Sequence, residues 1–123
     1  MTILLDTSIL IDVFRESAQA KNWLQQLEQV PSFSVVTLTE LHAGAKSQRE
    51  ELQIQELAGR LKLLPVGYEV AKTAGAHLKH FAKSHSVELA DALIAATAEH
   101  HGLALATLNI KHFPMFKRLR APY

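Results

Sequence analysis

Short apolar runs bounded by polar residues alternate with longer amphipathic patterns along this chain. Short runs of this kind predict strands, and apolar residues that recur every three to four positions predict helices between them. This alternation is typical of an α/β fold, in which helices cover both faces of a central parallel sheet in three layers. The predicted strands are 2–6, 33–37, 61–66 and 103–107, and the predicted helices are roughly 17–29, one after Gly44 that includes Ile54 to Leu61, one that includes Val70 to Phe81, and 88–100.

The composition predicts one domain over residues 1–123, since 48% of the residues are hydrophobic and can form a core. The chain has no cysteine, which excludes disulfides and thiol catalysis and fits a reducing compartment. No apolar run approaches the roughly 20 residues of a membrane span, and no signal peptide is visible. We therefore expect a cytoplasmic protein without membrane contacts.

Three acids stand where chemistry is expected. Asp6 ends the first predicted strand and Glu40 follows the second, and ligands of open α/β sheets bind beyond the carboxyl ends of strands. Asp91 interrupts an apolar stretch of the 88–100 helix, where a buried acid is costly without a partner. Converging carboxylates raise one another's pKa unless a cation compensates them, and carboxylates without Cys or His favour Mg²⁺ or Mn²⁺. The leading interpretation is metal-assisted phosphodiester hydrolysis.

Structural roles compete with this interpretation. The Asp6 side chain is a candidate cap of the helix that follows it, and Thr37 to Glu40 match the T-x-x-E pattern of a capping box. Glu88 lies one turn before Asp91, either as a further metal ligand or as a first-turn acid that the helix dipole favours. The seven histidines are not interpreted as a site, because nothing in the sequence places them beside the acids.

Polar and basic groups follow the last predicted strand. Thr107 and Asn109 supply a hydroxyl and an amide at the end of the sheet where the acids are expected. From Lys111 onward the chain has no acid, although its net charge is only +1, and aromatic residues alternate with cations. This pattern is typical of a surface for phosphates and stacked bases, and also of a solvated tail. The candidate RNA-binding cations are Lys117, Arg118 and Arg120.

Together these residues resemble a PIN-domain ribonuclease, and most closely the VapC-type toxin of a VapBC toxin-antitoxin system. The resemblance implies that Asp6, Glu40 and Asp91 hold Mg²⁺ or Mn²⁺, with Ser8 and Thr107 as supporting hydroxyls. It also implies endonucleolytic cleavage of RNA, a homodimer and a small antitoxin partner. The matching segments are 4–8, 34–41 with Gly44, 90–98 and 107–109 running into 111–113.

One position departs from the family pattern. Many relatives carry a fourth acid after the last strand, where this chain has Asn109. The resemblance therefore implies either one bound ion, or two with the second completed by Glu88, water or RNA phosphate. The alternative function is a non-catalytic PIN-like module that binds RNA or protein. A haloacid-dehalogenase-type phosphatase is disfavoured, because Ser8 stands where that class needs a second Asp.

Overall fold

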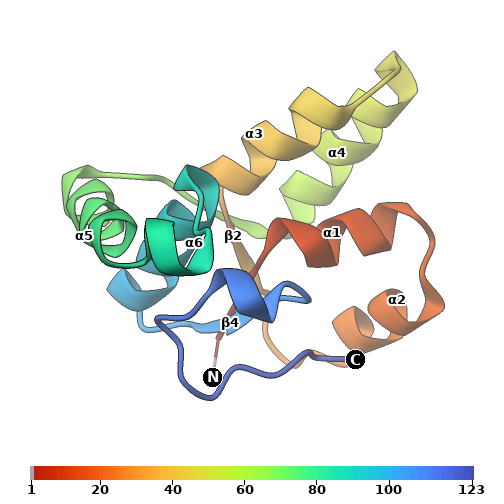
Figure 1. Ribbon diagram of the computed structural model, residues 1–123. Helices are drawn as coiled ribbons and strands as arrows, with labels where there is room; N and C mark the ends of the chain where they lie inside the picture. Colours follow the sequence, from red (N-terminus) through yellow and green to blue (C-terminus); the bar gives the residue numbers. More distant parts are fainter. Residues whose placement is uncertain (1) are drawn as a thin grey trace.

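The computed structural model describes residues 2–123. Four strands alternate with six α-helices and one 3₁₀-helix in this part of the chain (Figure 1). The elements in chain order are β1 (Ile3–Leu5), α1 (Thr7–Phe14), α2 (Ala18–Gln25), β2 (Ser32–Ser34), α3 (Val35–Gly44), α4 (Gln48–Arg60), β3 (Lys62–Leu64), α5 (Tyr68–His85), α6 (Leu89–His100), β4 (Ala104–Ala106) and η1 (Ile110–His112).

The strands form one parallel sheet in the order β3-β2-β1-β4. The chain builds β2 and β3 to one side of β1 and then crosses to place β4 on the other side. The strand order therefore reverses at β1, and such a switch point opens a crevice at the carboxyl ends of the strands. This arrangement confirms the predicted α/β class with a central parallel sheet and helices on both faces.

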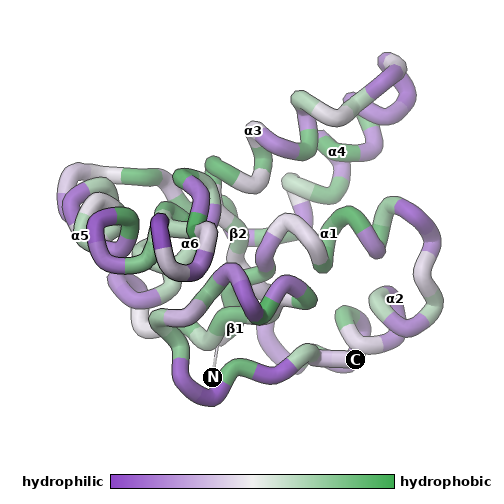
Figure 2. Tube along the Cα trace, viewed as in Figure 1, coloured by the Kyte–Doolittle hydropathy of each residue, from purple (hydrophilic) through white to green (hydrophobic). Residues whose placement is uncertain are grey.

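Alternate residues of β1 supply the two sides of the core, because successive side chains of a strand point to opposite faces. Leu4 packs with Ile94 of α6 and with Phe113, whereas Leu5 packs with Ile9 of α1 and Phe33 of β2. Helix α5 covers the outer side of α6, which completes that layer. Figure 2 shows hydrophobic residues along β1 and hydrophilic residues at the turn between α3 and α4. Within residues 2–123, no helix is both long and apolar enough to cross a bilayer.

The second half of the predicted strand 33–37 is wrong. Strand β2 ends at Ser34, whose hydroxyl accepts the Val36 N–H at 3.0 Å and so caps α3. A run of β-branched residues after a buried strand has strand propensity, but here the cap starts a helix within it. The proposed capping box from Thr37 to Glu40 is therefore also wrong, because both residues lie inside α3.

The other elements differ less from their predicted boundaries. The predicted helix 17–29 is shorter, since α2 ends at Gln25 and the chain has no helix between there and Pro31. Each strand has three residues and is shorter than predicted. The predicted helix 88–100 is confirmed as α6, with Glu88 at the N-cap position just before the helix.

Candidate active site

A pocket of about 340 Å³ lies at the carboxyl end of β1. Its walls come from the start and one face of α1, from α3, from α6 and from the segment after β4. The three acids singled out in the sequence, Asp6, Glu40 and Asp91, all line this pocket. The remaining lining residues are Thr7, Ser8, Ile11, Asp12, Arg15, Leu108 and Asn109.

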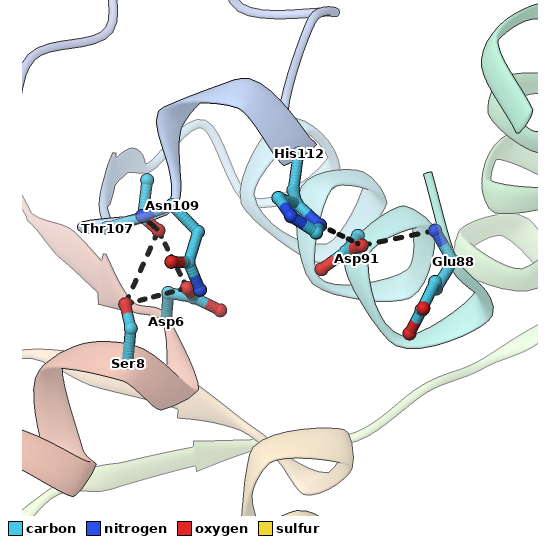
Figure 3. A network of polar contacts seen from close by, with 7 residues as sticks. All are labelled: Asp6, Ser8, Glu88, Asp91, Thr107, Asn109 and His112. Carbon is cyan, nitrogen blue, oxygen red and sulfur yellow. Dashed lines mark hydrogen bonds and ion pairs between the residues drawn. The ribbon is translucent and has the colours of Figure 1, made fainter. Parts of the chain in front are cut away.

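Asp6 is held by the strand register. Leu5 pairs with Ala106, so the next residues, Asp6 and Thr107, follow neighbouring strand ends. Asp6 is 4% exposed, and its Oδ2 accepts from the Thr107 hydroxyl at 2.7 Å and the Ser8 hydroxyl at 2.9 Å (Figure 3). It makes no side-chain cap on α1. The capping interpretation of Asp6 is therefore wrong, and its side chain belongs to the pocket.

The two hydroxyls are themselves fixed by the segment after β4. Ser8 Oγ accepts the Leu108 N–H at 3.1 Å, and Thr107 Oγ1 accepts the Asn109 N–H at 2.9 Å. Each hydroxyl thus accepts from the backbone and donates its one proton to Asp6. The result is a small network in which both donors to the buried carboxylate have defined orientations.

Glu40 is oriented from the start of α1. The Thr7 hydroxyl donates to Glu40 Oε1 at 2.6 Å and lies 2.9 Å from the hydroxyl of Thr37, which is fully buried. Thr7 directly follows Asp6 in the sequence. Two adjacent residues therefore supply one acid of the pocket and the hydrogen-bond donor to another. The side chain of Glu40 therefore reaches the pocket from α3 with one oxygen engaged.

Asp91 has a structural role that the sequence analysis missed. It is the third residue of α6, and its Oδ2 accepts the Glu88 N–H at 3.1 Å in a capping box. The same oxygen lies 3.2 Å from Nδ1 of His112. The view that an acid at Asp91 lacks a structural explanation is therefore wrong. Glu88, at the N-cap, is not among the residues that line the pocket.

The three acids share one pattern of hydrogen bonding. In each, a single carboxylate oxygen takes the bonds described above, and the other oxygen receives none from residues 2–123. An oxygen-only donor set of this kind suits Mg²⁺ or Mn²⁺. Among residues 2–123, however, no three acidic or histidine side chains already stand in an arrangement that could hold one ion. Ion binding therefore requires the carboxylates to draw closer together.

Asp12 is a fourth acid of the pocket that the sequence analysis missed. It lies one helical turn after Ser8 on α1, and this i, i+4 spacing was the available signal. Its Oδ2 accepts from the Tyr123 hydroxyl at 2.9 Å. Burial raises the pKa of Tyr123, and the hydrogen bond to Asp12 and the charge of that acid raise it further. Tyr123 therefore stays protonated and remains a donor at neutral pH.

Three histidines are beside acids within residues 2–123, and His112 is beside an acid of the pocket, contrary to the interpretation of the sequence. His112 contacts Asp91, and Nε2 of His77 lies 2.5 Å from Oε1 of Glu99. Both of these pairs join residues that are far apart in the chain, so no local pattern could reveal them, and the third pair joins His42 to Glu51. The candidate RNA-binding cations are exposed and lie outside the pocket lining; these are Lys117, Arg118 and Arg120.

Comparison with known proteins identifies the family. Residues 3–120 match the family model of the PIN domain. The chain is 36% identical to ribonuclease VapC10 of Mycobacterium tuberculosis, covering 98% of this chain and 92% of that protein. It is 31% identical to ribonuclease VapC1 of Rickettsia felis, covering 97% and 93%. This chain therefore belongs to the PIN-domain family, and the resemblance seen in the sequence is confirmed.

Solved structures agree with this assignment. A toxin-antitoxin complex from Klebsiella pneumoniae contains a chain that is 30% identical, with a TM-score of 0.85 over 99% of this chain and 98% of that one. FitAcB from Neisseria gonorrhoeae is also 30% identical, with a TM-score of 0.70 over 91% of each chain. The three-layer architecture is thus shared along nearly the whole length.

The buried Thr107 hydroxyl supports Asp6, and its removal tests that support. Thr107→Val keeps the shape of the side chain but leaves the Asn109 N–H and one Asp6 bond unmet. We expect the free energy of unfolding to fall by about 1–3 kcal/mol, measured by urea denaturation with chelator present. The matched control is Thr97→Val, since Thr97 is equally buried but donates to Leu93 O within its own helix. Equal losses in the two variants would show that Asp6 does not depend on Thr107.

Proposed function

We propose that this chain is a Mg²⁺- or Mn²⁺-dependent endoribonuclease, and the toxin of a type II toxin-antitoxin pair. The observation that carries the proposal is the convergence of Asp6, Glu40 and Asp91 on one pocket at the switch point of a parallel sheet. The relatives named as ribonucleases and the toxin-antitoxin complexes among the solved structures support it. We also propose that residues 1–123 form one domain, since the family match spans 3–120.

In this proposal the three acids hold the ion through the oxygens that the protein leaves without hydrogen bonds. The bound ion would supply Lewis-acid stabilisation of the phosphate and a water of lowered pKa. Ser8 and Thr107 hold Asp6 in place, and Thr7 holds Glu40. These neutral donors orient the carboxylates without cancelling their charge, which is what ligands for a hard cation require.

Two further lining residues suit a phosphodiester. Arg15 lies in the pocket wall and forms no ion pair with an acid within residues 2–123, and Asn109 lies in the wall with its side-chain amide. Both can donate to non-bridging phosphate oxygens. Hydrolysis forms a bond from the water oxygen to phosphorus and breaks the bond to a ribose oxygen, which takes up a proton. Arg15 would offset the charge that builds on the phosphate during this exchange.

A fourth carboxylate is available if a second ion binds. Asp12 lines the pocket whereas Glu88 does not. We therefore propose Asp12, in place of Glu88, as the acid that stands in for the one absent at Asn109. The RNA substrate, a cognate small antitoxin and a homodimer complete the proposal. The cytoplasmic location expected from the sequence stays a prediction.

Charge-removing substitutions in the pocket test the catalytic proposal. Asp6→Asn and Glu40→Gln keep the side-chain shape but bind a divalent cation poorly. We expect both to reduce cleavage of a random-sequence RNA pool to background, and we expect EDTA to do the same to the wild type. The control is Glu69→Gln, at an exposed acid in the first turn of α5.

The outcomes separate the two candidate functions. Cleavage that survives EDTA, or a fully active Glu40→Gln variant, would contradict the shared metal site. Binding of RNA or protein without any cleavage by the wild type, with Mg²⁺ or Mn²⁺ supplied, would instead favour the non-catalytic module.

The basic C-terminal segment is proposed to contact RNA phosphates. Lys117, Arg118 and Arg120 are exposed, and long cations bind polyanions with release of counterions. In the Asp6→Asn background, replacing all three with Ala should weaken RNA binding and flatten the slope of log K against log[salt] by about two to three units. Filter binding at several salt concentrations measures both quantities.

The matched control removes the same charge elsewhere. Lys72, Lys79 and Lys83 are three exposed lysines of α5, and their triple Ala variant should change affinity and slope much less. Equal effects of the two triple variants would mean that net charge alone matters. No effect of the C-terminal variant would make that segment a solvated tail.

A further inference from the structure

We propose that His112 is a positioning residue for the metal site, whose Nδ1–H fixes the carboxylate of Asp91. The inference rests on the proposed function, and it assigns a role in metal binding to a side chain that is distant in sequence from Asp91. Its basis is the approach of His112 Nδ1 to within 3.2 Å of Asp91 Oδ2 (Figure 3). An ionised carboxylate can only accept, so the ring nitrogen that faces it carries the proton.

The backbone around His112 is anchored on both sides. His112 ends η1, and its N–H donates to the carbonyl of Asn109 at 3.0 Å. The next residue, Phe113, is 1% exposed and packs in the core against Leu4 and Ile94. The ring therefore projects from a fixed point of the chain, which is a requirement for orienting another side chain.

Two donors converge on one oxygen of Asp91. The Glu88 N–H and His112 Nδ1 approach Oδ2 from opposite sides in Figure 3. Asp6 shows the same arrangement, because the Ser8 and Thr107 hydroxyls both bind its Oδ2. Two donors in different directions restrict rotation of the carboxylate plane, so the remaining oxygen keeps one direction. His112 thus orients the carboxylate of Asp91, as the Ser8 and Thr107 hydroxyls orient that of Asp6.

Two other roles fit the structure less well. As a direct ligand, His112 would present a ring nitrogen to the ion, but Nδ1 faces Asp91 and the residue is absent from the pocket lining. As a phosphate contact, it would be a free cation, whereas it pairs with an acid. A positioning role is the one that depends on the observed contact between His112 and Asp91.

The chemistry of the side chains gives a sharp test. The amide nitrogen of Asn is the same number of bonds from Cβ as Nδ1 of His, whereas that of Gln matches Nε2. His112→Asn can therefore replace the bond to Asp91, and His112→Gln and His112→Ala cannot. Calorimetric titration of Mn²⁺ into the protein without RNA should show roughly ten- to hundredfold weaker binding for Gln and Ala. The Asn variant should bind close to the wild-type affinity.

A spectroscopic signature checks the contact itself. When an imidazole ring is neutral, its hydrogen-bond partner decides which nitrogen carries the proton. Imidazole ¹⁵N correlation spectra of the wild type should show the proton of His112 on Nδ1, and Asp91→Ala should move it to Nε2. The control is His80→Ala, an exposed residue of α5, which should leave Mn²⁺ affinity unchanged.

The results that would overturn the inference are distinct from those that would overturn the proposed function. Equal loss of Mn²⁺ affinity in the Asn and Gln variants would make His112 a ligand, and unchanged affinity in the Ala variant would remove any role in metal binding. A weaker RNA affinity in EDTA with unchanged Mn²⁺ affinity would make it a phosphate contact. A wild-type protein that binds no Mn²⁺ would overturn the proposed function itself, and this role with it.

Discussion

The parallel pairing of β1 with β4 is the constraint on which the site depends. The register that sets Leu5 beside Ala106 also sets Asp6 beside Thr107, and the Asp6 N–H bonds to the Ala106 carbonyl at 2.9 Å. A shift of this register by one residue would turn every side chain of β1 to the other face of the sheet. It would move Asp6 away from its two hydroxyl donors and bury an acid without partners. The core residues of β1 and the chemistry of Asp6 are therefore fixed by the same backbone hydrogen bonds.

The acids of the pocket are held in position at the cost of like-charge repulsion. Asp6, Glu40 and Asp91 line one pocket, and one oxygen of each contacts a group from a distant part of the chain. A carboxylate that is held in this way keeps one oxygen free to accept a cation, and the cation would offset the repulsion among the charges as it draws the acids together. The supporting residues matter because they decide which oxygens face the pocket.

Much of this arrangement could be predicted from the sequence. The apolar runs predicted the sheet, and the acids that follow the first two runs, Asp6 and Glu40, line the pocket, as does Asp91 from an apolar helix. The start of α3 could not be predicted in the same way, because Val35 and Val36 have strand propensity and only the Ser34 cap identifies the helix. Strand propensity and helix capping favour different structures there, and the structure has the helix.

Residues that act through long-range contacts were outside the reach of local patterns. His112 meets Asp91 because η1 folds back over the start of α6, and Tyr123 meets Asp12 because the end of the chain returns to α1. Asp91 was the opposite case. Its spacing from Glu88 already matched a capping arrangement, although its apolar neighbours favoured a functional interpretation.

We propose that Asp6, Glu40 and Asp91 together hold one divalent ion through the oxygens that the protein leaves free. Anomalous diffraction from crystals grown with Mn²⁺ tests it most directly. We expect a peak in this pocket roughly 2.0–2.6 Å from one oxygen of each acid, with Asp6 Oδ2 still bonded to Ser8 and Thr107. A peak that lacks one or more of these acids, or no peak at saturating Mn²⁺, would contradict this arrangement.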